Sequence, residues 1–188
     1  MHEELAAWHE EFDRRERLGR VQRTAAVLRW LEPYDEGLSA GGEEARLALS
    51  EAKDAFIYGL PLASLFSSHV ACERMLAGLF GLLPDDAAPK GWEKWGLGRL
   101  VPAARERGWL GTELTSDLLV LCDTRKVTGH FRRPTARGTL NWRIAEMLPF
   151  EDDAENLVGL LLKDAAQGRR AAFRLAYSPE EGLRRVLD

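Results

Sequence analysis

Apolar residues recur at steps of three and four along the periodic segments of this chain, which is the repeat of a helix face and not of a strand. Ala, Leu, Glu and Arg dominate those segments, and no alternating run of β-branched residues occurs. The sequence therefore predicts an all-α fold, a helical bundle.

Glycine and proline residues divide this pattern into separate helices. The segment 61–82 is apolar over most of its circumference, so we expect it to be the central core helix. With 188 residues, of which 45% are apolar, the chain has the size of one domain, with an added N-terminal helix at about 2–32 before a core at about 43–177. The expected helices cover about 2–31, 43–58, 61–82, 97–107, Thr112 to the CDTRKVTGH segment, 142–148 and 152–177.

Charge and cysteine content disfavour several classes of protein. The first residues carry charges throughout, so we expect no signal peptide, no membrane span and a cytoplasmic location. Cys72 and Cys122 lie inside apolar segments, which predicts buried thiols; we expect no disulfide framework, metal site or cofactor. The net charge of -4 argues against a protein that coats nucleic acid.

The stretch from Arg125 to Arg143 departs from this acidic balance. It contains no Asp or Glu, and its basic residues are Arg125, Lys126, Arg132, Arg133, Arg137 and Arg143. Such a run is either a solvated loop or a surface that contacts phosphates. The composition of the stretch leaves both interpretations open.

Arg125 and His130 lie five positions apart in this stretch. On an uninterrupted helix they would lie roughly 140° apart, on different faces. Gly129 changes this expectation, because a glycine at a helix end readily adopts the left-handed conformation that reverses the chain. We therefore expect His130 to fold back toward Arg125, where the terminal carbonyls favour both cations. The alternative is that both residues only cap the helix.

The segment SDLLVLCDTRKVTGHFRRP resembles the Arg-x4-6-His motif of the HEPN (higher eukaryotes and prokaryotes nucleotide-binding) superfamily. Upstream, AFIYGLPLASLFSSHVACERMLAGLF resembles the first core helices of bacterial HEPN-like families, with an internal Glu at Glu73. The resemblance spans about 43–177. It implies a HEPN-like helical bundle, a homodimer with two motifs facing one cleft, and RNA cleavage without metal. The sequence departs from the motif at Lys126, where Asn, Asp or His is common.

RNA cleavage of this kind needs a base, an acid and positive charge for the developing phosphorane. The resemblance assigns proton transfer to His130 and phosphate stabilisation to Arg125, and a dimer would bring a second copy of each to the cleft. Further basic residues are expected to contact the RNA backbone, unless they only form an exposed loop: Lys126, Arg132, Arg133 and Arg137.

His69 and Glu73 lie four residues apart on one face of the central helix, where an unpaired charge is costly. We expect them to satisfy each other, or Glu73 to anchor Arg125 across the bundle. Asp123 and Asp117 are further candidates to support Arg125. Tryptophans could stack bases, but they are more often core residues, so no site is placed on Trp92, Trp95 or Trp142.

The function expected from these residues is a metal-independent HEPN-type endoribonuclease, acting on RNA as a dimer. It would be a toxin or an effector of anti-phage defence, with an antitoxin or defence-system protein as its partner. The alternative is a catalytically inactive HEPN-like module that binds a protein partner or a nucleotide. A helical DNA-binding protein is disfavoured, because no helix concentrates basic residues on one face.

Overall fold

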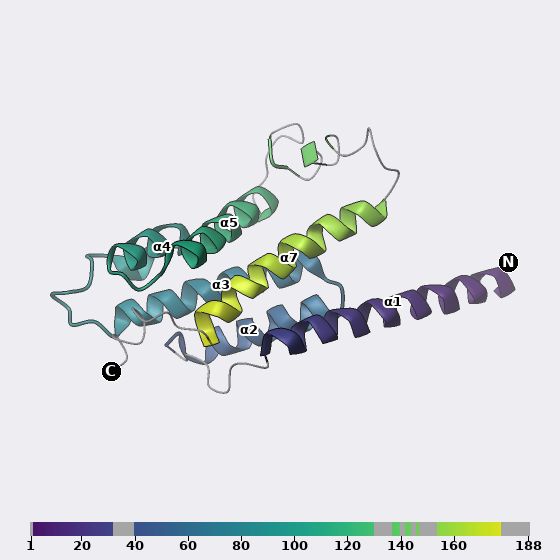
Figure 1. Cartoon of the computed structure of the whole chain (residues 1–188), viewed down its shortest axis with the longest axis horizontal. Helices are drawn as coiled ribbons and strands as arrows, with labels where there is room; N and C mark the ends of the chain where they lie inside the picture. The colour runs from purple at the N-terminus through teal and green to yellow at the C-terminus, as the bar shows by residue number, and fades with distance from the viewer. Residues whose placement is uncertain are drawn as a thin grey trace.

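The computed structural model describes residues 2–31, 40–129, 137–139, 142–143, 146 and 154–177 of the 188-residue chain. Within these residues the fold is all-helical and contains no strand, as the periodicity predicts (Figure 1). The elements are α1 (His2–Leu31), α2 (Gly42–Ile57), α3 (Pro61–Gly81), the short 3₁₀ helix η1 (Trp92–Lys94), α4 (Leu97–Glu106), α5 (Thr112–Gly129) and α7 (Ala154–Tyr177). The helix expected at 142–148 lies largely outside the described residues.

Helix α3 is the centre of the bundle, as its apolar circumference predicts. It packs against α2, α7, α4 and α5, and the buried face includes Leu65, Cys72, Met75 and Leu79. Pro61 stands in its first turn, where the missing N–H leaves no hydrogen bond unmade. The apolar faces of α3 therefore determine where the surrounding helices pack.

Helix α5 is held between α3 and α7, and this packing positions its C-terminal turn. Its buried side chains are Leu114, Thr115, Leu118, Leu121 and Cys122. On α7 the guanidinium of Arg174 donates a 3.1 Å hydrogen bond to Asp117 and lies 3.5 Å from Glu113. Asp117 thus joins α5 to α7, rather than supporting Arg125.

Both cysteines are free and buried, as their apolar surroundings predict. Burial raises the pKa of the Cys72 thiol far above its usual range and that of Cys122 to about 11. None of the described helices has the length and apolar content needed to cross a membrane.

A charged side chain that the periodicity does not reveal lies in the core between α7 and α2. The guanidinium of Arg169 is fully buried and lies over two aromatic rings, 4.9 Å from the ring centre of Phe56 and 5.3 Å from that of Phe173. Burial lowers its pKa to about 10, so it still carries its charge at neutral pH. This stack joins α7 to α2 from inside the bundle.

We predict opposite effects for alanine at two helical glycines. A Cβ at Gly78 of α3 would overlap the carbonyl oxygen of Ala40, so Gly78→Ala should lower the free energy of unfolding by about 1–3 kcal/mol. Gly159→Ala on α7 is the matched control: it meets nothing within 4 Å and should raise that energy by about 0.5–1 kcal/mol. Urea unfolding measures both, and equal effects would contradict the close approach at Gly78.

Candidate functional site

The candidate site lies at the C-terminal turn of α5. Arg125 and Lys126 are in this turn, half-buried and exposed respectively. The other predicted residues of the motif, His130, Arg132 and Arg133, lie outside the described residues. The expected convergence of His130 on Arg125 therefore stays a prediction.

The expected conformation of Gly129 is wrong. It is the last residue of α5, and its φ is not among the positive values found at other glycines. Its missing side chain serves packing instead, because a Cβ there would stand 2.9 Å from the Phe66 ring of α3. The same ring lies 6.0 Å from the guanidinium of Arg125. Gly129 therefore allows α3 to approach the turn that carries Arg125.

Four charged or titratable residues form what we call the α3–α5 cluster: His69, Glu73, Arg125 and Lys126. Burial is the largest influence on the half-buried imidazole of His69 and lowers its pKa. Glu73 opposes that shift, whereas Arg125 and Lys126 add to it through their positive charge. The imidazole is therefore neutral at neutral pH and able to accept a proton.

Glu73 has a different hydrogen-bond partner from either of the two expected. Its carboxylate accepts a 2.9 Å hydrogen bond from the backbone N–H of Leu97, the first residue of α4. Gly96, at the N-cap of α4, has no side chain that could accept it. The described chain contains neither a Glu73–Arg125 ion pair nor a His69–Glu73 hydrogen bond. Glu73 thus caps α4 and only contributes its charge to the cluster.

Asp123, expected to support Arg125, pairs with Lys126. Lys126 Nζ and Asp123 Oδ1 lie 3.3 Å apart across one helical turn, and both side chains are more than half exposed. An exposed pair of this kind stabilises a protein by at most about 1 kcal/mol. A phosphate could therefore compete with Asp123 for Lys126 at little cost.

The rest of the basic stretch divides into two parts. Arg137 is exposed, with its guanidinium 5.8 Å from the ring centre of Trp142. Arg143 forms a bidentate ion pair with Asp164 of α7, in which its guanidinium donates one hydrogen bond to each carboxylate oxygen, one of them 3.1 Å long. Of these two arginines only Arg137 presents its charge to solvent.

Two of the tryptophans pack on the core side of the bundle. The rings of Trp92 and Trp95 lie 6.4 Å and 6.3 Å from that of Phe80. This agrees with leaving them out of the site.

In the described ranges, no three His, Cys, Asp or Glu side chains gather in a way that could hold a metal ion.

Comparison of the chain with known protein families, with curated proteins and with solved structures finds no match. The function must therefore be argued from the residues of the α3–α5 cluster and their neighbours.

Sequence reasoning missed two contributors to this site. Phe66 was not singled out, although it packs against Gly129 and lies near Arg125. The partnership of Glu73 with α4 was also missed. Its signal was the helix start at Gly96-Leu97, which lacks the Ser, Thr, Asp or Asn that normally caps a helix and so requires an acceptor from elsewhere.

We predict that Glu73→Ala lowers the free energy of unfolding by about 1 kcal/mol, because the first turn of α4 loses its acceptor. Glu73→Gln should cost less, since its amide oxygen can still accept the hydrogen bond. Glu51→Ala, at an exposed position of α2, is the matched control and should change little. Urea unfolding compares the three, and an effect of Glu73→Ala no larger than that of Glu51→Ala would rule out the cap.

A second prediction concerns pH. The folded protein lowers the pKa of His69 below 6.5, so on acidification the unfolded chain takes up a proton more readily than the native state. His69 therefore lowers the free energy of unfolding as the pH falls below 6.5, and it has no such effect above that pH. His69→Gln should lose less stability between about pH 7.5 and 5.5 than the wild type, a window above the range of most carboxylates. Parallel stability curves for the two proteins would contradict the shift.

Proposed function

We propose that this protein is a metal-independent endoribonuclease of the HEPN type, active as a dimer, with Arg125 and His130 in its active site. The proposal rests on one observation above all. Arg125 lies beside Phe66 and shares the surface between α3 and α5 with Lys126 and the neutral imidazole of His69. Cationic groups and a proton acceptor are thus gathered where the Arg-x4-His segment leaves α5.

The chemistry requires two proton transfers. One imidazole removes the proton of the 2′-hydroxyl, the oxygen attacks the phosphorus, and the 5′-oxygen leaves with a proton from a second imidazole. The products carry a 2′,3′-cyclic phosphate and a 5′-hydroxyl. We assign the imidazoles to His130 and to the His130 of a second copy, and His69 offers a further acceptor within one copy. Arg125 stabilises the charge of the phosphorane.

Substrate binding in this proposal is electrostatic. Lys126 and Arg137 have exposed side chains, and in the sequence they flank Arg132 and Arg133 in a stretch, 125–143, without acidic residues. Contacts of this kind hold the phosphate backbone without reading the sequence. A ribonuclease with such a site would suit a toxin or a defence effector that a partner protein keeps inactive.

One observation favours a second candidate, an inactive HEPN-like module that binds a nucleotide or a protein partner. Lys126 follows Arg125 directly and is already paired with Asp123, where a HEPN nuclease commonly has Asn, Asp or His. In that case the same cations would bind phosphate groups without cleavage.

The two candidates differ in a cleavage assay. End-labelled RNA incubated with the wild type in EDTA should give products with a 2′,3′-cyclic phosphate. Arg125→Ala should lower the rate by about 10²–10³-fold and His130→Ala by about 10²–10⁴-fold. Arg46→Ala, an exposed arginine of α2, is the control and should leave the rate unchanged.

Cleavage that survives both Arg125→Ala and His130→Ala would reject the proposed site. Binding of RNA or a nucleotide without cleavage, lost in Arg125→Ala but not in Arg46→Ala, would favour the inactive module. His69→Gln tests the further acceptor: a lowered rate with unchanged RNA affinity assigns it to proton transfer.

A further inference from the structure

The anchorage of α1 on the bundle leaves a groove open beside it. Arg23 donates a 2.9 Å hydrogen bond to the carbonyl oxygen of Ile57, and Val27 is 2% exposed and packs with Phe56 and Ala165. The adjoining side of α1 and the C-terminal end of α2 line a cavity of about 460 Å³. A cavity of this size is typical of a site for a small molecule.

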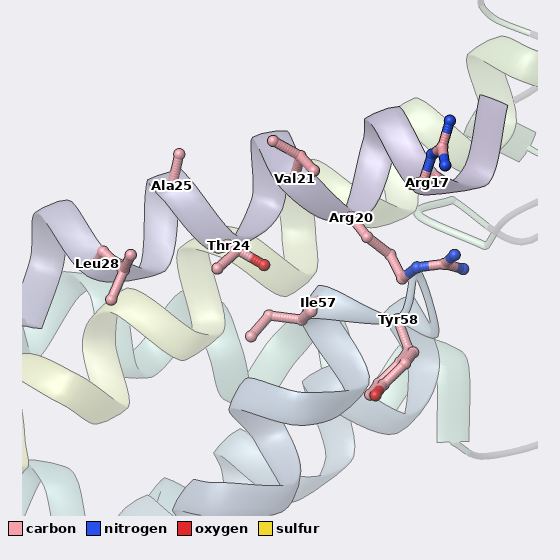
Figure 2. A pocket seen from close by; sticks show the side chains of 8 residues that line it. All are labelled: Arg17, Arg20, Val21, Thr24, Ala25, Leu28, Ile57 and Tyr58. Carbon is pink, nitrogen blue, oxygen red and sulfur yellow. The ribbon is translucent and has the colours of Figure 1, made fainter. Parts of the chain in front are cut away.

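The lining of the groove changes from basic to apolar along its length. Arg17 and Arg20 stand at one end, where Arg20 extends toward Tyr58, and Leu28 stands at the other end (Figure 2). Between these ends the apolar lining includes Val21, Ala25 and Ile57. Val21 and Leu28 are 61% and 54% exposed, so the groove leaves apolar surface in contact with water. A ligand that covers this surface therefore gains free energy.

The basic end of the groove is suited to an anionic group. Within the described residues neither Arg17 nor Arg20 makes an ion pair, and the neighbouring carboxylate of Glu16 contacts Arg23 instead, at 3.4 Å. Side chains three residues apart lie on the same face of a helix, so both guanidiniums can donate to one anion. A carboxylate is the matching group, because its two oxygens accept hydrogen bonds from a guanidinium in pairs.

The dimensions of the groove favour a single alkyl chain over a protein helix. Arg20 and Leu28 lie roughly 12 Å apart along the axis of α1, at about 1.5 Å per residue. An α-helix of that length is about 10 Å wide with its side chains and would occupy roughly twice the volume of the cavity. An unbranched alkyl chain of medium length spans the same distance within the cavity. The occupant that fits both the charge and the size is therefore a small amphipathic molecule.

We propose that this groove binds a medium-chain carboxylic acid, with its carboxylate between Arg17 and Arg20 and its alkyl chain along Val21, Ala25 and Leu28. Charge holds the ligand at one end, and burial of apolar surface holds it along the rest of the groove. None of these residues belongs to the α3–α5 cluster. The binding therefore does not depend on the ribonuclease activity, and its test uses no RNA.

Isothermal titration calorimetry of the full chain with decanoate tests the basic end. The wild type should bind decanoate at one saturable site, with a Kd below about 1 mM. Arg17→Gln with Arg20→Gln should raise this Kd at least about tenfold, because the carboxylate loses both of its donors. Arg14→Gln with Arg15→Gln is the matched control: it removes the same charge from exposed arginines of α1 outside the groove and should leave the Kd unchanged.

The apolar part is tested by shortening the ligand and by changing the lining. Octanoate, two carbons shorter, should bind about fivefold more weakly than decanoate. Val21→Ser with Leu28→Ser should weaken decanoate binding at least about fivefold with unchanged helical circular dichroism, since both side chains are exposed. Leu47→Ser, at an exposed position of α2, is the control and should bind like the wild type.

Three results would overturn the proposal. The first is a wild type without saturable decanoate binding, and the second is an arginine double variant, Arg17→Gln with Arg20→Gln, that binds decanoate like the wild type. The third is a decanoate Kd that rises with protein concentration, because a second copy of the chain would then already fill the groove.

Discussion

The apolar circumference of α3 is the constraint on which the rest of the structure depends. A helix that is apolar on most sides must be covered on most sides, and α2, α4, α5 and α7 do so. Two of its polar residues, His69 and Glu73, lie where α5 and α4 meet it. The α3–α5 cluster is a consequence of this arrangement, because α5 can bring Arg125 to α3 only where Phe66 and Gly129 allow close contact.

Besides the ion pairs Arg143–Asp164 and Arg174–Asp117, two charged side chains join helices of this bundle through contacts of another kind. The carboxylate of Glu73 meets the positive end of a helix, and the guanidinium of Arg169 meets two aromatic faces. Both arrangements link elements distant in sequence: α3 to α4, and α7 to α2. The basic surface at the end of α5 differs from these, because Lys126 and Arg137 remain exposed and the acidic neighbour Asp123 holds Lys126 only weakly.

The helices could be predicted from the sequence because their periodicity and their Gly and Pro boundaries are local properties. Most predicted boundaries fall within about two residues of the structure, and the central place of α3 followed from its composition. The errors and omissions concern contacts between distant residues. Gly129 was predicted to be a turn residue, whereas in the structure its lack of a side chain makes room for the Phe66 ring. Likewise, no local feature of the sequence shows that Arg169 is buried beside Phe56 and Phe173. At the site, the basic turn of α5 was predictable, whereas the partner of Glu73 depends on where α4 begins.

The anchorage of α1 has a mechanical consequence. Its contacts with the bundle lie around Arg23 and Val27, and Leu5 stands roughly 30 Å further along the helix axis at about 1.5 Å per residue. A helix held at one end behaves as a lever, so a tilt of about 5° at the anchorage carries Leu5 through nearly 3 Å, roughly the rise of two residues. A small change in side-chain packing around Arg23 and Val27 would therefore appear, much enlarged, as a displacement of the N-terminal end of α1.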